Sequence, residues 1–304
     1  MSEVTSEVRP DVPVPPSKRE LLRVEERDDV LAIVLDRPES SVNLIDEAWL
    51  QEMTGAIDRA ERERPRGLVL LSAKHRNFIA GADVSLIASL TETAEAAAKA
   101  RAGQELLSRI EDLPFPTVCA INGSCLGGGL ETALAFQYRI VANDDRVVLG
   151  LPEVRLGILP GFGGTFRLPR SVGITTALPL ILTGKNVRPR KALAIGLADR
   201  LAAPELLTKV AIDVARGAHL SRRPRPLVTR ATDWALGRTA PGKALLERMT
   251  RRNVEKQTGG HYPAPFEIVG RVLGGYGAPR ASAMHAEAEA FARLAVTSVS
   301  KEPG

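Results

Sequence analysis

The feature that decides the fold is a glycine-rich stretch, Gly123-Ser124-Cys125-Leu126-Gly127-Gly128-Gly129-Leu130-Glu131. It follows the apolar run 117–121, so the pattern predicts a buried strand, a loop and then a helix at 130–136. Glycines let the backbone approach a ligand closely. The start of a helix also gathers N–H groups that have no acceptor within the helix. A tight turn against a closely packed helix is the alternative explanation of this stretch.

A second loop of the same kind comes earlier in the chain, Phe78-Ile79-Ala80-Gly81-Ala82-Asp83. It follows another apolar run, 68–71, which also predicts a buried strand. Two such loops after neighbouring strands are able to aim two backbone N–H donors at one oxygen atom. That arrangement is an oxyanion hole, which stabilises an enolate or a tetrahedral intermediate.

Two glutamates lie near these loops. Glu131 falls in the first turn of the expected helix, and Glu153 follows Leu151-Pro152. Two acids that converge on an apolar pocket suit a hydration reaction, because one takes a proton from water and the other delivers a proton to carbon. The alternatives are a favourable charge at a helix N-terminus for Glu131 and a surface loop acid for Glu153.

Strands and helices alternate on both sides of this segment, which implies α/β architecture with crossover connections. We expect strands at 21–24, 30–35, 68–71, 117–121, 139–142 and 147–149, and helices at 46–62, 94–110 and 130–136. Beyond Gly161 the pattern is mainly helical, at 175–182, 189–195, 203–217, 241–256 and 278–297. The expected organisation is a flexible leader at 1–18 without the apolar core of a secretory signal, an α/β core at 19–215 and a helical C-terminal region at 216–304.

The composition limits the function classes. The chain has 304 residues, 44% of them apolar and 25% charged, as soluble globular proteins do. A net charge of +5 suits an anionic ligand, while an aromatic content of 4% argues against a nucleic-acid partner. No apolar run is long enough for a membrane span. We expect Cys119 and Cys125 to be buried and reduced, which favours a cytoplasmic location and no metal site.

The remaining glycine clusters do not match nucleotide-binding patterns. Gly161-Phe162-Gly163-Gly164-Thr165-Phe166 lacks the glycine at the sixth position of the dinucleotide fingerprint. A glycine-rich phosphate loop that ends in Gly-Lys-Ser or Gly-Lys-Thr does not occur either. We therefore expect no nicotinamide and no other cofactor.

Taken together, the two loops and the two acids resemble the crotonase (enoyl-CoA hydratase/isomerase) family over about residues 21–201. The stretches Gly123–Glu131, Gln137-Tyr138-Arg139-Ile140 and 255–265 are most similar to the hydratase domain at the N-terminus of the multifunctional α-subunit of fatty-acid β-oxidation. The resemblance implies a repeated ββα spiral core and an acyl-coenzyme A substrate. It also implies homotrimers or hexamers, or association with other β-oxidation enzymes. Multifunctional relatives continue into a dehydrogenase, so we expect either a single-function protein or a hydratase module.

The resemblance also implies roles for individual residues. Ala82 and Gly128 match the backbone donors to the thioester oxygen, Glu131 and Glu153 match the catalytic acids, and Gly161 matches a donor near the catalytic water. Further contacts to the substrate are expected from Ala80, Asp83, Leu86 and Phe162, although core packing explains the two larger side chains equally well. The candidate partners of the coenzyme A phosphates are Lys74, Arg76 and Lys185.

The expected function is enoyl-CoA hydration, the syn addition of water to 2-trans-enoyl-CoA to give 3-hydroxyacyl-CoA. The same residues suit an isomerase that moves a double bond. Thioester hydrolysis and dehalogenation would keep the oxyanion loops but would not need both acids in these places. A binding module of a β-oxidation complex would need neither acid.

Overall fold

Two β-sheets form the centre of the molecule. The computed structural model describes residues 20–220, 225–259 and 262–297. The larger sheet contains, in spatial order, β1 (Leu22–Arg27), β2 (Val30–Leu35), β3 (Leu68–Ser72), β5 (Thr117–Ile121), β7 (Tyr138–Ala142) and β9 (Arg200–Ala202). Only β1 runs antiparallel to its neighbour, and the other pairs are parallel. The smaller, parallel sheet contains β4 (Asn77–Ile79), β6 (Ser124–Leu126) and β8 (Leu149–Gly150).

The chain passes between the two sheets in a repeating order. β3, β5 and β7 of the larger sheet are followed by β4, β6 and β8 of the smaller one, and a helical segment comes next each time. These segments are α2 (Val84–Ser89) with α3 (Thr93–Glu111), then α4 (Gly128–Ala135), then the 3-10 turn Glu153–Leu156 with α5 (Gly164–Val172). The expected mixed α/β core with a parallel sheet is confirmed, and its repeat is ββα.

Burial explains the larger sheet and its first helix. All residues of β2 and β5 are buried, as expected for strands of a parallel sheet that is covered on both faces. α1 (Glu47–Glu63) starts at Asp46, whose side chain accepts a hydrogen bond from the Trp49 backbone N–H at 2.8 Å. Its buried face has the three- and four-residue spacing of a helix and consists of Trp49, Met53, Ala56, Ile57 and Ala60.

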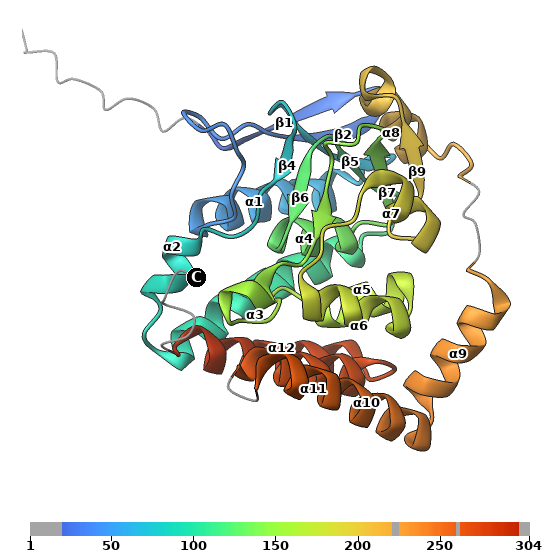
Figure 1. Ribbon diagram of the computed structural model, residues 1–304. Helices are drawn as coiled ribbons and strands as arrows, with labels where there is room; N and C mark the ends of the chain where they lie inside the picture. Colours follow the sequence, from blue (N-terminus) through green and yellow to red (C-terminus); the bar gives the residue numbers. More distant parts are fainter. Residues whose placement is uncertain (1–19, 221–224, 260–261, 298–304) are drawn as a thin grey trace, which may run out of the picture.

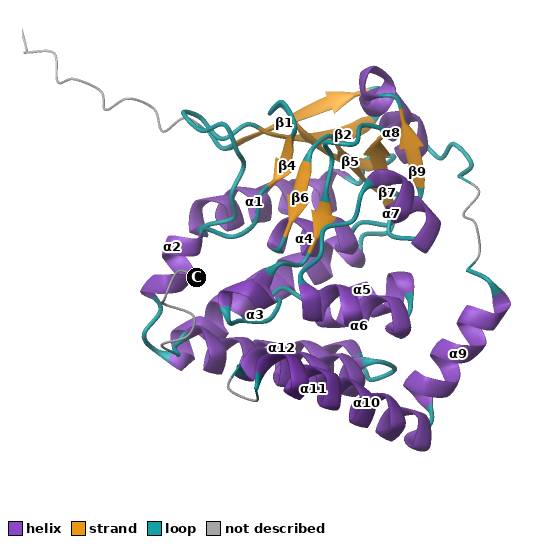
Figure 2. Ribbon diagram, in the orientation of Figure 1, coloured by secondary structure: helices purple, strands orange, loops and turns teal. Residues whose placement is uncertain are grey.

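Helices make up the rest of the described chain. They are α6 (Ile174–Thr183), α7 (Pro189–Ile195), α8 (Leu207–Ala215) behind a short 3-10 turn, α9 (Leu227–Arg238), α10 (Ala240–Thr258), α11 (Pro263–Gly275) and α12 (Arg280–Ala295). α8 packs on the larger sheet. α10, α11 and α12 form a layer on the far side of α3, α5 and α6 from that sheet (Figures 1 and 2). None of the described helices is long and apolar enough to cross a membrane.

The first hairpin differs from the sequence-based prediction. We expected the first strand to end at residue 24, but β1 continues to Arg27 and the turn is confined to Asp28 and Asp29. Both aspartates have positive φ, 51° and 67°, which a two-residue hairpin turn requires and which Asp tolerates better than most residues. β1 is an edge strand, so its charged side chains reach solvent without ending the strand.

Deletion of residues 217–304 is expected to destabilise the core. The deletion removes buried apolar side chains of α11 and α12, namely Ile268, Val269, Val272, Phe291 and Leu294. Each contributes about 1.5–3 kcal/mol by burial. Their sum is comparable to the whole stability of a typical domain, about 5–15 kcal/mol. Sedimentation velocity and thermal unfolding of full and truncated protein would show aggregation or altered assembly and a lower Tm. A soluble, active truncation with unchanged assembly would contradict this expectation.

Candidate active site

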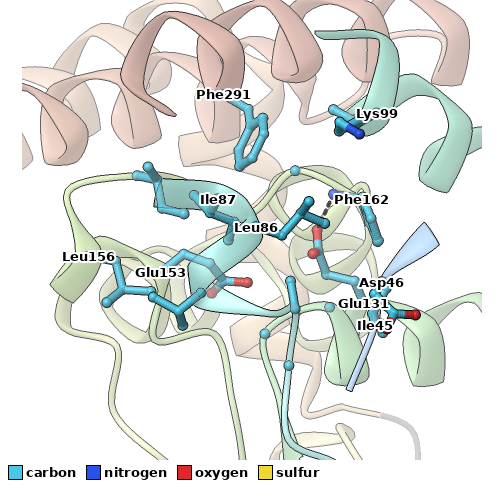
Figure 3. Close-up of a pocket in the computed structure, with 18 of the residues that line it drawn as sticks. Ile45, Asp46, Leu86, Ile87, Lys99, Glu131, Glu153, Leu156, Phe162 and Phe291 are labelled. Atoms are coloured by element: carbon cyan, nitrogen blue, oxygen red, sulfur yellow. Dashed lines mark hydrogen bonds between the residues drawn. The ribbon is translucent and has the colours of Figure 1, made fainter. Parts of the chain in front are cut away.

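A mostly apolar cavity of about 180 Å³ lies where α2, α3, α4 and α12 meet the loops after β4 and β8. Its walls include Ile45, Leu50, Ile87, Leu90, Ile158 and Phe291. Figure 3 shows Phe291 entering from α12, opposite Leu86 and Ile87 of α2. Elements from distant parts of the chain therefore enclose one space.

Glu131 and Glu153 both line this cavity. Glu131 comes from the first turn of α4, and Glu153 begins the 3-10 turn after β8, so two successive ββα repeats supply the pair. Only 2% of Glu131 and 9% of Glu153 is exposed. Figure 3 shows the two carboxylates entering the cavity from different sides. A Cβ atom added at Gly127 would lie 3.1 Å from Glu153 Oε1, which places this carboxylate next to the glycine loop.

The two carboxylates differ in their hydrogen bonds. Glu131 Oε1 accepts from the backbone N–H groups of Phe162 (2.8 Å) and Gly164 (2.7 Å). Glu153 Oε2 is buried and has no hydrogen-bond partner among the described residues. A buried polar atom normally has a hydrogen-bond partner, and a substrate or a bound water would supply one here. Glu131 is therefore fixed by the protein, whereas Glu153 lines the cavity with one carboxylate oxygen that has no hydrogen-bond partner among the described residues.

Burial raises the pKa of both carboxyl groups, because the interior disfavours their charged forms. It raises the pKa of Glu153 to about 8, and the charge of Glu287 adds to this effect. Burial also raises the pKa of Glu131 well above its usual value. The negative charges of Glu153 and Glu287 raise this pKa further, whereas the two N–H donors lower it. These donors favour the ionised form of Glu131, whereas Glu153 Oε2 has no such donor among the described residues. The two carboxyl groups face the same cavity and titrate as a pair.

Backbone donors complete the site. Gly128 is the first residue of α4, so its N–H has no acceptor within the helix. Gly127 before it has φ 53° and ψ −129°, a conformation that strains any residue with a Cβ atom. Ala82 forms a parallel β-bridge with Ile45. In this bridge the Ile45 N–H donates to the Gly81 carbonyl oxygen, and the Asp83 N–H donates to the Ile45 carbonyl oxygen. The N–H of Ala82 therefore points to the other side, and both donors line the cavity.

Comparison with known proteins agrees with this geometry. The model of the family described as "Enoyl-CoA hydratase/isomerase" matches residues 25–254. The chain belongs to this family. The fatty acid oxidation complex subunit alpha of Aliivibrio fischeri is 41% identical over 272 residues, which are 89% of this chain and 39% of that protein. The chain thus spans about two fifths of the length of that curated relative.

Solved structures of the family have the same fold. Enoyl-CoA hydratase from Bacillus anthracis is 33% identical with a TM-score of 0.59, over 64% of this chain and 75% of that chain. Enoyl-CoA hydratase from Thermoplasma volcanium is 27% identical with a TM-score of 0.60, over 83% of this chain and 97% of that chain. These relatives support the crotonase resemblance that the sequence indicated.

The structure brings most of the predicted substrate-contacting residues to the cavity. Ala80, Leu86, Gly161 and Phe162 line it, together with the acids and the two backbone donors. Asp83 does not line the main cavity. Its side chain caps α2 by accepting a hydrogen bond from the Ser85 N–H at 2.9 Å, so the structure gives it a local structural role.

The predicted phosphate ligands lie elsewhere. Lys74, Arg76 and Lys185 are absent from the cavity lining. Lys74 Nζ forms an ion pair with Asp36 Oδ1 at 2.9 Å. Arg76 lies in the turn before β4 with a φ of 59°. Their role in binding coenzyme A phosphates stays a prediction.

The cavity and its surroundings include residues that the sequence did not predict, among them Lys99, Phe291 and Glu287. Lys99 and Phe291 line the cavity, while Glu287 is fully buried behind the loop 161–165. Phe291 and Glu287 lie on α12, for which the sequence showed only a helical pattern rich in Ala and Glu. Within the described residues, no group of three or more His, Cys, Asp or Glu side chains is arranged to hold a metal ion.

Proposed function

We propose that this protein hydrates 2-trans-enoyl-CoA to 3-hydroxyacyl-CoA by syn addition of water. The observation that carries the proposal is the convergence of Glu131, Glu153 and the N–H groups of Ala82 and Gly128 on one apolar cavity. Family membership and the printed names of the relatives support the substrate class. The acyl-CoA is the substrate, and the reaction needs no cofactor.

In this mechanism, the Ala82 and Gly128 N–H groups bind the thioester carbonyl oxygen and draw electron density from the β-carbon. Glu131, ionised and held by two N–H donors, takes a proton from water as the water attacks the β-carbon. The two backbone donors stabilise the enolate that results. Protonated Glu153 then delivers a proton to the α-carbon, and Gly161 contributes to the position of the water.

The residues in and around the cavity suggest where the other parts of the substrate bind. We assign the acyl chain to the apolar surface of Leu86, Ile87, Phe162 and Phe291. The coenzyme A phosphates are assigned to Lys74, Arg76 and Lys185 outside the cavity. The protein acts in the cytoplasm as a homotrimer or hexamer, or with other β-oxidation enzymes. We assign residues 19–215 to an α/β core, of which the structure describes 20–215, and residues from 216 to a helical region. The leader predicted at 1–18 lies outside the described residues.

Double-bond isomerisation is the second candidate function, because the same pair of acids is able to move a proton between two carbons of a 3-enoyl thioester. A direct comparison separates the two functions. Purified protein is incubated with crotonyl-CoA and, separately, with a 3-enoyl-CoA, and the products are identified by mass spectrometry. Faster formation of 3-hydroxyacyl-CoA from crotonyl-CoA supports the hydratase, whereas accumulation of 2-enoyl-CoA with little hydroxylated product would favour the isomerase.

We expect the hydration rate to fall at alkaline pH. Glu153 must be protonated to donate to the α-carbon, and burial raises its pKa to about 8. Below that pH the donor form predominates, and it is lost as the pH rises through about 8. The measurement is kcat/KM for crotonyl-CoA between about pH 6 and pH 10, because kcat/KM reports the pKa values of the free enzyme. Circular dichroism at each pH is the control for folding. A kcat/KM that stays constant to about pH 10 in folded protein would contradict the role of Glu153.

A further inference from the structure

The loop 161–165 donates hydrogen bonds to a second buried carboxylate besides Glu131. Its N–H groups at Phe162 and Gly164 donate to Glu131, and the intervening Gly163 N–H donates to Glu287 Oε1 at 2.5 Å. The next N–H in the chain, at Thr165, donates to Glu287 Oε2 at 2.9 Å. Successive N–H groups therefore alternate between two carboxylates, one from α4 and one from α12.

Glu287 is held firmly in this place. Its side chain is fully buried. Besides the two backbone donors, the Thr165 hydroxyl donates to Oε2 at 2.5 Å and Gln104 Nε2 donates to Oε1 at 3.2 Å. The same Gln104 nitrogen donates to the carbonyl oxygen of Gly161 at 3.0 Å. The two ends of the loop are thus attached to one carboxylate and its glutamine neighbour.

Only a carboxylate satisfies all these donors. Both oxygens of Glu287 accept from backbone N–H groups, which are unable to accept in return. A glutamine in its place would turn an NH₂ group towards one of these N–H groups and leave a buried donor without an acceptor. The side chain lies one helical turn before Phe291, so the same face of α12 also supplies a wall of the cavity.

We propose that Glu287 is a positioning residue for the reaction: it fixes the loop 161–165 so that the Phe162 and Gly164 N–H groups hold Glu131 in its reactive orientation. The inference rests on the proposed role of Glu131 and deepens it. It assigns to the C-terminal helix a part in the chemistry, although the carboxylate of Glu287 itself does not touch the substrate. With Glu131 displaced, the Ala82 and Gly128 N–H groups would still bind the thioester oxygen, but Glu131 would take the proton from water less often.

The test compares Glu287→Gln with two other variants. Thr165→Val removes only the hydroxyl donor to Glu287. Asp233→Asn is the matched control, because Asp233 is also a buried carboxylate that holds the start of a helix, accepting from the Thr175 N–H at 3.0 Å and from its hydroxyl at 2.7 Å, away from the cavity. For each variant kcat and KM are measured with crotonyl-CoA, and Tm by thermal unfolding. The Phe162 amide resonance is followed in ¹⁵N-phenylalanine-labelled protein and assigned among the 7 phenylalanines with Phe162→Leu.

Glu287→Gln is expected to lower kcat by about 10–100-fold with KM changed less than about threefold, and to shift the Phe162 amide resonance. Thr165→Val should lower kcat and shift the Phe162 amide resonance in the same direction, but by smaller amounts. Asp233→Asn should lower Tm but leave kcat and the resonance as in the wild type. The inference is overturned if folded Glu287→Gln keeps the wild-type kcat and resonance, or if Asp233→Asn loses as much activity. Should Glu287→Gln not fold, a Thr165→Val variant identical to the wild type in both readouts overturns it.

The two proposals fail in different ways. If the wild-type protein does not hydrate crotonyl-CoA, the proposed function falls and the amide resonance alone judges Glu287. A resonance that moves in Glu287→Gln but not in Asp233→Asn would then support the positioning role, and one that moves in neither would overturn it.

Discussion

Glu131→Gln and Glu153→Gln are each expected to lower kcat by about 10²–10⁴-fold while the fold is kept. In Glu131→Gln the amide oxygen is able to accept from both Phe162 N–H and Gly164 N–H, because these two donors share one carboxylate oxygen in the wild type. The variant therefore keeps the structural bonds and loses the base. Glu153→Gln removes the acid, and its Oε2 position has no hydrogen-bond partner among the described residues that the change would disrupt.

In the proposed mechanism the two acids act on the same reaction, so the double variant should lose less than the product of the two single effects. Steady-state hydration of crotonyl-CoA gives the rates, and circular dichroism verifies folding. Asp233→Asn serves again as the control for the neutralisation of a buried carboxylate far from the cavity. If either single glutamine variant turns over at close to the wild-type rate, the role assigned to that residue is wrong.

Gly128→Val is expected to lower turnover by about 10²–10³-fold, the usual cost of one lost oxyanion donor. A Cβ atom at Gly128 would lie 3.0 Å from Ile45 Cδ1 and 3.7 Å from the Phe162 ring, closer to Ile45 than nearly all real Cβ contacts. The two further methyl groups of valine would crowd the cavity where the thioester carbonyl is expected to bind. Either the Ile45 side chain or the start of α4 must then move, and the valine methyl groups would keep the thioester oxygen away from the Gly128 N–H.

A paired measurement identifies this effect. Turnover of crotonyl-CoA is compared with the Kd of free coenzyme A, which has no acyl carbonyl and should be affected less. The matched control is Gly55→Val in α1, because Gly55 has no atom within 4 Å of its added Cβ. A folded Gly128→Val variant with full turnover would remove Gly128 from the site. Equal loss of turnover and of coenzyme A binding would instead indicate a general packing role for the glycine loop.

The core of the fold was predictable where burial alone determines the structure. The strands at 30–35 and 117–121 have the predicted bounds because every residue in them is buried on a covered sheet. β4 and β6 were missed because a strand of three residues shows no periodicity. α5 and α11 were missed because prolines and glycines occupy their first turns or interiors, and tertiary packing outweighs those weak local preferences.

The site was predictable where loops carry a recognisable pattern. Glu131, Glu153 and Gly128 stand in motifs that resemble the family, and the structure brings them to one cavity. Phe291 and Glu287 were not predictable, because α12 lies far along the chain from the cavity and from the loop 161–165 that it contacts in space. Their helix shows only an apolar face, and nothing local distinguishes a glutamate in solvent from one that holds a loop.

We propose that this chain adds water to an enoyl thioester with Glu131 and Glu153. The most direct measurement supplies purified full-length protein with crotonyl-CoA in water enriched in a heavy oxygen isotope and identifies the product by mass spectrometry. The wild type is expected to form 3-hydroxybutyryl-CoA with the heavy oxygen on its β-carbon, and the folded double variant Glu131→Gln/Glu153→Gln is expected to form none above background. Absence of this product from folded wild-type protein, or its equal formation by the double variant, would rule out the proposed hydration by these two acids.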